Sequence, residues 1–383
     1  MPYQCNWGII STGWIAQQFS HDLLISPATR GADDLDHRIV AVASRTKSKA
    51  QAFVEKLDVP YSETIETYGS YSDLYANERV DVCYIGTPHS HHYANVFAAL
   101  TSGKNVLVEK PMAVTAEQAR VLVDLAREKK CFLMEAVWTR FQPYAAKLRE
   151  VLQSGVIGEI RAAQSELCVD FHSAEPTHRL LNPDLAGGAL LDLGPYPWTQ
   201  LCLALRAKPQ PSDKRLQLPE LVASMTKTST GVDASVVATI KFVQANGKVV
   251  HGTMTAAQNA QSAHSRVLYV QGSHGFMETQ WPTFRPSSFR YEAWDSPEDY
   301  AAGDKPPTRA DRFEFGSRPG DIWGFAWEAD AVARSLRDGK LESEHMPLNE
   351  TLLMMEVFDE MRKQGGLLYP ESLETADASV APS

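Results

Sequence analysis

The sequence WGIISTGWIA, residues 7–16, joins a β-like apolar run to a turn and then to the start of a helical pattern. Ser11, Gly13 and Ala16 stand at the three marked positions of the G-x-G-x-x-G/A fingerprint of dinucleotide-binding turns. Gly13 would let the backbone approach a pyrophosphate, which would lie on the N-terminus of the following helix. Ser11 departs from the fingerprint, so it either strains the turn or adds a hydroxyl toward the phosphates. Taken alone the motif is weak, because an ordinary strand–turn–helix can match it.

The surroundings of this turn strengthen the interpretation. Further apolar, strand-like runs follow at 38–44, 80–87, 105–110 and 131–137, with helical patterns between them. Continuous apolar strands indicate burial on both faces, and strand–helix alternation indicates parallel pairing. The sequence therefore predicts an α/β fold in which residues 1–140 form a Rossmann domain with a doubly wound parallel sheet.

The pattern changes after residue 140. Several β-like runs between residues 159 and 280 follow one another without intervening helices. They predict a C-terminal α+β domain over residues 141–370, with a mixed or antiparallel open sheet. Residues 285–312, rich in Pro, Ser and Asp, are expected to form a long surface excursion. The apolar-poor end, residues 371–383, is expected to be a disordered tail.

Length, charge and cysteine usage limit the function classes. A chain of 383 residues suggests two domains, and its net charge of −10 argues against a general nucleic-acid binder, which needs a basic face. No apolar stretch approaches the roughly 20 residues that cross a bilayer, and the N-terminus lacks the charged region of a signal peptide. Five cysteines, an odd number, are expected to be reduced thiols. We therefore expect a cytoplasmic protein without membrane or nucleic-acid partners.

The end of the second predicted strand bears on the cofactor. An NAD site usually places a carboxylate there for the ribose 2′-hydroxyl, whereas an arginine accommodates a 2′-phosphate. Here Ser44 and Arg45 lead into Thr46-Lys47-Ser48-Lys49, with no carboxylate. A solvated basic helix start is the alternative, but cations at a helix N-terminus oppose the helix dipole. The pattern favours NADP over NAD.

Clusters of polar residues follow the third, fourth and fifth predicted strands, at the edge where such sheets bind ligands. They are Thr87-Pro88-His89-Ser90-His91-His92, Glu109-Lys110-Pro111 and Trp138-Thr139-Arg140-Phe141; farther on, Asp192 and Tyr196 stand four residues apart. The adjacent histidines could suggest a metal, yet no Cys or carboxylate accompanies them. We expect no metal site. Lysine is almost never buried unpaired, so Lys110 at the end of an apolar strand suggests a partner.

Together these residues resemble the Gfo/Idh/MocA oxidoreductase family. Glu109-Lys110-Pro111 is similar to its E-K-P motif, and Thr87-Pro88 with His92 to its T-P-x-x-x-H region. MEAVWTRF (134–141) and GGALLDLGPYP (187–197) resemble the dimeric dihydrodiol dehydrogenase branch. HRLLNPDLAGGALLDLG (178–194) and LRDGKLES (336–343) resemble the fungal NADP-dependent D-xylose 1-dehydrogenases within it. The resemblance extends to about residue 370.

The resemblance implies NADP as cofactor, a homodimer and roles for individual residues. The implied catalytic residues are Lys110, Tyr196 and Asp192. The implied cofactor-binding residues are Ser11, Thr12, Gly13, Trp14, Ile15, Ser44, Arg45, Lys49, Thr87, Pro88, His92, Glu109, Lys110, Trp138 and Arg140. The implied substrate-binding residues are His89, Trp138, Phe141, Arg179, Asp192 and Tyr196.

The implied reaction is oxidation of an aldose, D-xylose, at C1 to the lactone. It requires hydride loss from carbon and proton loss from oxygen. A tyrosine with a pKa near 10 is a poor base at neutral pH, and an adjacent ammonium such as that of Lys110 would stabilise the phenolate. Oxidation of trans-1,2-dihydrobenzene-1,2-diol by the same residues is an alternative substrate class. A cofactor-binding regulator without chemistry is a third possibility, which the presence of Lys110 and Tyr196 disfavours.

Overall fold

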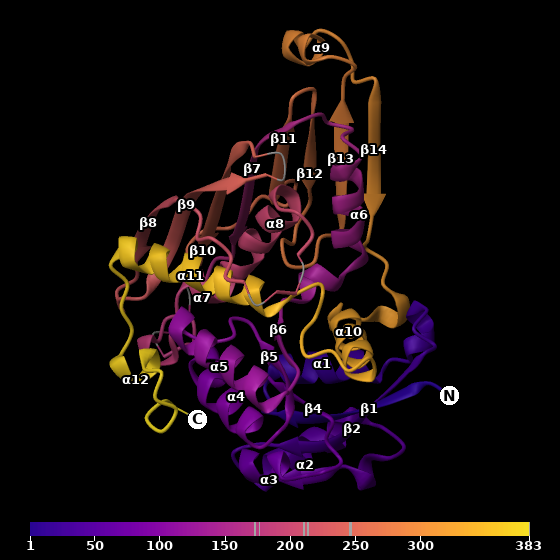
Figure 1. Cartoon of the computed structure of the whole chain (residues 1–383), viewed down its shortest axis with the longest axis vertical. Helices are drawn as coiled ribbons and strands as arrows, with labels where there is room; N and C mark the ends of the chain where they lie inside the picture. Colours follow the sequence, from indigo (N-terminus) through magenta and orange to yellow (C-terminus); the bar gives the residue numbers. More distant parts are fainter. Residues whose placement is uncertain (172–173, 176, 210, 213, 245–246, 383) are drawn as a thin grey trace.

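The computed structural model describes residues 1–382 apart from 172–173, 176, 210, 213 and 245–246. Two sheets divide the chain, with the Rossmann domain in the lower half of Figure 1 and the second sheet in the upper half. The first sheet has the strand order β3-β2-β1-β4-β5-β6, and all its pairs are parallel. This confirms the predicted doubly wound sheet.

The elements of this half alternate as expected. Its strands are β1 (Tyr3–Ile10), β2 (Leu35–Ala43), β3 (Glu66–Tyr68), β4 (Val82–Ile85), β5 (Asn105–Glu109) and β6 (Leu133–Ala136). Its helices are α1 (Trp14–Leu24), α2 (Lys47–Leu57), α3 (Tyr71–Tyr75), α4 (His92–Thr101) and α5 (Ala116–Lys129). The short elements β3 and α3 are additional to the sequence prediction, because three and five residues are too few to show a period.

The second sheet has eight strands in the order β14-β13-β12-β11-β7-β10-β9-β8. Its strands are β7 (Ile160–Cys168), β8 (Leu221–Lys227), β9 (Asp233–Val243), β10 (Val249–Ala257), β11 (Leu268–Gly272), β12 (Gly275–Thr279), β13 (Ser288–Ala293) and β14 (Arg309–Glu314). The pair β7–β10 is parallel and the other pairs are antiparallel. The predicted mixed sheet is therefore confirmed.

Helices cover one face of this sheet (Figure 1). They are α6 (Pro143–Gln153), α7 (Ala189–Leu193), α8 (Pro195–Leu205) and α11 (Leu348–Gly365). Among the residues that the structure describes, no helix covers the opposite face in this way, and that face carries the exposed valines Val222, Val237 and Val249. One face therefore forms a core and the other remains open.

Two segments differ from the expectations of the sequence. Residues 285–312 are not a plain surface excursion: they contribute β13, the short helix α9 (Pro297–Ala302) and most of β14. Residues 371–382 do not project as a free tail. They include α12 (Glu371–Glu374), bury Leu373, and accept hydrogen bonds from Gln118 at the carbonyls of Leu373 and Thr375, 2.7 and 2.8 Å away.

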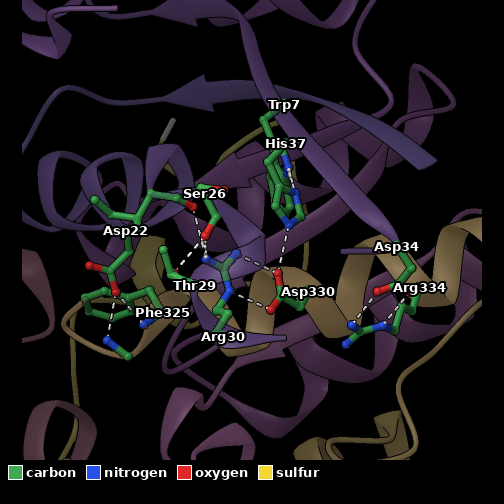
Figure 2. Close-up of polar contacts among 12 residues, drawn as sticks. Trp7, Asp22, Ser26, Thr29, Arg30, Asp34, His37, Phe325, Asp330 and Arg334 are labelled. Atoms are coloured by element: carbon green, nitrogen blue, oxygen red, sulfur yellow. Dashed lines mark hydrogen bonds and ion pairs between the residues drawn. The ribbon is translucent and has the colours of Figure 1, made fainter. Parts of the chain in front are cut away.

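Helix α10 (Phe325–Arg337) lies near the C-terminal end of the chain but packs on α1, β1 and β2 of the Rossmann domain. Figure 2 shows the polar contacts that hold it there. Asp330 accepts two hydrogen bonds from Arg30, at 2.7 and 2.8 Å, and lies 3.0 Å from His37 Nε2. Because Trp7 Nε1 donates to His37 Nδ1 at 3.1 Å, the imidazole proton lies on Nε2, facing Asp330. The predicted domain boundary at residue 140 therefore misses a later segment that completes the first core.

Candidate active site

The carboxyl ends of the parallel strands meet at one edge of the first sheet, which faces α7 and α8 of the second domain. Lys110 follows β5 at this edge, and its side chain is only 11% exposed. Its Nζ donates to the backbone carbonyl of Asp192 at 2.6 Å and to Oδ1 of the same residue at 3.3 Å. The partner that the sequence predicted for this lysine is therefore an aspartate in α7.

Asp192 lies between two cations. Arg179 donates to its Oδ1 at 2.9 Å, so this oxygen accepts from Arg179 and Lys110 together. Burial alone would raise the pKa of the Asp192 carboxyl, but Lys110 and Arg179 hold it well below its usual range. Burial would lower the pKa of Lys110, yet Asp192 and Tyr196 raise it above its ordinary value. Both groups are therefore charged at neutral pH.

Tyr196 stands beside Lys110, whose Nζ lies 5.1 Å from the centroid of the phenol ring. Trp138 Nε1 donates to the phenol oxygen at 3.3 Å, and the Phe284 ring lies 5.5 Å from the Tyr196 ring. Burial raises the pKa of Tyr196 above its usual value, and the ammonium of Lys110 opposes that rise. The sequence argument counted only the effect of Lys110, whereas desolvation has the larger effect on the pKa of Tyr196.

Gly188 and Pro195 explain how α7 and α8 reach this position. Gly188 has φ +128°, and a Cβ there would come within 1.9 Å of Asp233 Oδ1. Asp233 Oδ2 accepts from Leu190 N at 2.6 Å and so holds the first turn of α7. Pro195 takes the first position of α8, where its missing N–H costs nothing. Pro195 therefore starts the helix that presents Tyr196.

The predicted histidines have different surroundings. His89 is buried and its Nε2 donates to the Ala186 carbonyl at 2.6 Å; burial lowers its pKa to about 4, so it is neutral. His92 lies between the carbonyls of Thr87 and Pro111, at 2.9 and 2.7 Å, and burial lowers its pKa to about 3. His92 thus links the turns after β4 and β5. Within the described part of the chain, no group of three or more His, Cys, Asp and Glu side chains is arranged to hold a metal.

Arg140 is directed away from the Lys110 cluster. It is buried and donates to Glu350 at 3.0 Å, and Arg206 donates to the other oxygen of Glu350 at 2.9 Å. The guanidinium of Arg140 thus pairs with α11, and its contact with the cofactor stays a prediction. Phe141 next to it lies 5.5 Å from the ring of His345.

Two buried carboxyls support the backbone next to Lys110. The sequence resemblance implies that Glu109 binds the cofactor and indicates no role for Glu135. Glu109 accepts from Tyr84 at 2.7 Å and from Lys110 N at 3.3 Å, and burial raises its pKa. Glu135 accepts from Met112 N at 2.8 Å, and burial raises its pKa to about 7. Both carboxyls therefore fix the backbone around Lys110. The sequence signal for Glu135 was only its place at the end of a strand.

The turn after β1 fits a phosphorylated dinucleotide. Ser11 has φ +83°, and its Oγ accepts from Gly13 N at 3.3 Å. The serine that stands in place of the usual glycine therefore strains the turn and also gives it a side-chain hydrogen bond. Helix α1 begins without a side-chain cap or an acidic residue in its first turn. Thr12 Oγ1 lies 3.1 Å from Ser44 Oγ, which joins this turn to the end of β2. Free N–H groups at such a helix start favour an anion.

The basic segment after Ser44 is open to solvent. Arg45, Lys47 and Lys49 are exposed, and none of them forms an ion pair with a residue that the structure describes. Thr46 caps α2 by accepting from Lys49 N at 3.4 Å. Cations without carboxylate partners, next to the end of β2, fit the 2′-phosphate of NADP.

Comparison with known proteins agrees with this geometry. The family described as "Oxidoreductase family, NAD-binding Rossmann fold" matches residues 5–137, and "GFO/IDH/MocA C-terminal domain" matches residues 145–278. The chain belongs to the Gfo/Idh/MocA oxidoreductase family. As a member of this family, it is an enzyme of the oxidoreductase class. The residues of the turn after β1 and those at the end of β2 fit NADP as its cofactor.

Individual relatives show to which members of the family this chain is similar. The "D-xylose 1-dehydrogenase (NADP(+))" of Hypocrea jecorina is 42% identical over 98% of this chain and 95% of its own length. The "Trans-1,2-dihydrobenzene-1,2-diol dehydrogenase" of Bos taurus is 34% identical over 95% of this chain and 98% of its own length. Levoglucosan dehydrogenase in complex with NADH and levoglucosan shares the fold of this Gfo/Idh/MocA member, with a TM-score of 0.77 at 17% identity over 95% of this chain and 97% of that one.

Proposed function

We propose that this chain is an NADP-dependent dehydrogenase that oxidises an aldose, D-xylose, at C1 to the lactone. The observation that carries the proposal is the buried contact of Lys110 with Asp192 and the Tyr196 ring at the carboxyl edge of the first sheet. Full-length similarity to a D-xylose 1-dehydrogenase supports the substrate. The exposed cations after β2 support NADP.

The chain's own residues divide the work of proton transfer. Tyr196 accepts the proton from the C1 hydroxyl oxygen, and the ammonium of Lys110 stabilises the phenolate that precedes this step. Asp192 fixes Lys110 through two contacts and stays ionised. NADP, when bound, would supply the hydride acceptor for the hydrogen of C1. Both hydrogens that leave the sugar are thus accounted for.

The substrate side of the cluster is aromatic and partly polar. The Trp138 ring lies 6.0 Å from the Phe284 ring, and both adjoin Tyr196. We propose that the rings of Trp138 and Phe284 pack on the apolar face of a pyranose. We also propose that the neutral imidazole of His89 and the guanidinium of Arg179 contact the hydroxyl groups of the sugar. The same two rings favour a second candidate, a trans-dihydrodiol, for which the Bos taurus relative is named.

A panel of aldoses and one trans-dihydrodiol, each with NADP, tests the substrate by formation of NADPH. We expect D-xylose to give the highest kcat/KM. A higher value for the dihydrodiol would replace the first candidate by the second, and no NADPH from any of these would reject both.

Two variants test the proton step. Tyr196→Phe and Lys110→Met should each lower kcat by about 10²–10⁴-fold, the usual contribution of general acid–base catalysis. NADP binding, followed by calorimetry, should persist in Tyr196→Phe. A variant that retains full turnover would remove its residue from the proton step.

We also propose a homodimer and a cytoplasmic location. The uncovered face of the second sheet, with Val222, Val237 and Val249 exposed, supports self-association. All five cysteines are buried and unpaired, which fits a reducing compartment. None of the helices in the described residues is long and apolar enough to cross a bilayer. Sedimentation of the purified chain tests the dimer, which a monomer at micromolar concentration would contradict.

A further inference from the structure

Trp14 contacts a cluster of three side chains to which no role has been assigned, those of Trp323, Arg285 and Arg318. Trp14, the first residue of α1, is 59% exposed, and its ring meets that of Trp323 edge-on with 5.6 Å between centroids. The guanidinium of Arg285 lies 4.4 Å from the centroid of the Trp323 ring. Arg318 donates to the backbone carbonyl of Arg285 at 3.4 Å. The contacts thus run from the phosphate turn to two neighbouring arginines.

These arginines are unusual because no carboxylate pairs with either of them within the described residues. Their Nε atoms are buried and have no hydrogen-bond partner. The nearby carboxylate of Asp22 is already used: its oxygens accept from Trp323 N, Gly324 N and Phe325 N at 2.7, 2.7 and 2.9 Å. Figure 2 shows Asp22 at the start of α10. Two partly buried cations side by side are unfavourable without an anion.

The pKa values of the two arginines also indicate that their charges lack a compensating anion. Burial lowers the pKa of Arg285, and burial together with the neighbouring Arg285 lowers the pKa of Arg318 to about 10. An anion placed between the two guanidinium groups would reverse both effects.

The position of the cluster indicates which anion. Phe284, the residue before Arg285, packs on Trp138 and Tyr196, where the nicotinamide end is expected. Trp14 belongs to the turn that would hold the pyrophosphate. Arg285 therefore lies between the reacting centre and the phosphate turn, next to the middle of an NADP molecule that spans the two.

We propose that Arg285 and Arg318 form an anion subsite of the second domain that binds the pyrophosphate of NADP opposite the N-terminus of α1. The inference rests on the proposed NADP-dependent function and adds two residues that the first-turn fingerprint does not contain. Arg285 follows β12 and Arg318 precedes α10, so the bound pyrophosphate would contact residues outside the first turn. Trp14 and Trp323, whose rings meet beside these arginines, would report cofactor binding through their fluorescence.

Binding measurements with the full chain and no sugar test the subsite. The probes are NADP, 2′-phospho-ADP-ribose, which keeps the pyrophosphate, and adenosine 2′,5′-bisphosphate, which lacks it. Arg285→Met and Arg318→Met should each weaken binding of the first two by about tenfold or more, as expected for charge-assisted hydrogen bonds. Binding of adenosine 2′,5′-bisphosphate should change less than about twofold. Tryptophan fluorescence and calorimetry give the dissociation constants.

Control variants separate this subsite from general effects. Arg266→Met removes a half-exposed arginine that also lies over an aromatic ring, Tyr269 at 4.8 Å, on the open sheet, and it should leave all three constants unchanged. Arg285→Lys keeps the charge and should recover part of the NADP affinity. Urea unfolding of each variant shows that it is folded.

Three outcomes would overturn the assignment. Unchanged NADP and 2′-phospho-ADP-ribose binding in both arginine variants would exclude a pyrophosphate contact. Equal weakening of all three probes would indicate a general electrostatic effect instead. Failure of the wild-type chain to bind NADP would reject the proposed function and this subsite together, whereas the first two outcomes leave the proposed function standing.

Discussion

Arg45 is the residue on which the choice between NADP and NAD depends. It follows β2, is exposed, and forms no ion pair with the described residues. Arg45→Ala should lower kcat/KM for NADP by about tenfold to a hundredfold, the loss of one or two hydrogen bonds to a charged group. The value for NAD should change little, because NAD has no 2′-phosphate.

Lys56 offers a control for this variant, since it is an exposed cation in the last turn of α2, at the opposite end of that helix from Arg45. Lys56→Ala should reduce NADP efficiency much less than Arg45→Ala. Equal losses for the two variants, or equal losses with NADP and NAD, would argue against a specific 2′-phosphate contact.

Ser11 shows a different kind of residue effect. Its φ of +83° lies in the left-handed region, which costs a non-glycine residue roughly 1–2 kcal/mol. Ser11→Gly should therefore have a higher free energy of unfolding than Ser11→Ala, by about 1 kcal/mol after the entropic cost of glycine is subtracted, since neither variant keeps the bond to Gly13 N. Ser11→Ala keeps the strain and loses the bond to Gly13 N, so it should be less stable than the wild type. Urea unfolding orders the three proteins, and a glycine variant below the alanine variant would contradict the interpretation.

At the scale of elements, the short helix α7 depends on a strand of the second sheet. Asp233 at the start of β9 holds the first turn of α7 through Leu190 N, and α7 carries Asp192. Tyr369, from the chain beyond α11, donates to the Gly187 carbonyl at 2.7 Å. Asp192, which we propose to be catalytic, thus lies in a five-residue helix that is positioned by Asp233, 41 residues later in the chain, and by Tyr369, which follows α11.

Burial raises the pKa of Asp233 to about 6, which makes the stability of this element depend on pH. The folded state keeps the proton between pH 4 and 6, where the unfolded chain has lost it, so stability falls as pH rises through this range. Asp233→Asn removes the titration. The free energy of unfolding of the wild type should fall relative to the variant by on the order of 2 kcal/mol from pH 4 to pH 6.5.

Urea unfolding at several pH values measures this difference. Asp304→Asn, at an exposed position, serves as the control and should follow the wild type. A difference between wild type and Asp233→Asn that grows with pH in favour of the wild type would contradict the assigned direction.

For the whole molecule, the return of the chain to its first domain is the decisive feature. Asp330 of α10 is buried against Arg30 and His37, and the Arg30 side chain is fully buried. Although burial raises the pKa of Asp330, hydrogen bonds from Arg30 and His37 lower it below its usual value. Asp330→Asn would leave Arg30 buried without a counter-charge and should cost about 3–5 kcal/mol of the free energy of unfolding.

Figure 2 contains the matched control for this prediction. Asp34 pairs with Arg334 and Arg337, which lie in α10 as Asp330 does, but the Asp34 side chain is 43% exposed. Asp34→Asn should cost less than about 1 kcal/mol, as surface ion pairs do. Similar losses in the two variants would show that burial does not decide the strength of the α10 attachment.

The periodicity of apolar residues predicted most of this architecture, because buried strands and amphipathic helices each give a characteristic pattern within a short stretch of sequence. It also predicted which strand ends carry Lys110 and Trp138, since parallel strands share one carboxyl edge. It did not predict the contacts that depend on distant segments. Glu350 faces Arg140 and Asp330 faces Arg30 across 210 and 300 residues, and no spacing in the sequence records such pairs. The tail was misjudged because backbone carbonyls, which composition does not show, provide its docking to Gln118.

The late position of α10 has a consequence for biosynthesis. Phe325, Ala329 and Met346 share a buried cluster with Trp7 and Ile9, so the apolar surface of the nucleotide domain stays uncovered until residues 325–346 have left the ribosome. A nascent chain stalled near residue 320 would expose this surface to chaperones. Expression of the first 140 residues by themselves should yield an aggregation-prone fragment rather than an autonomous unit.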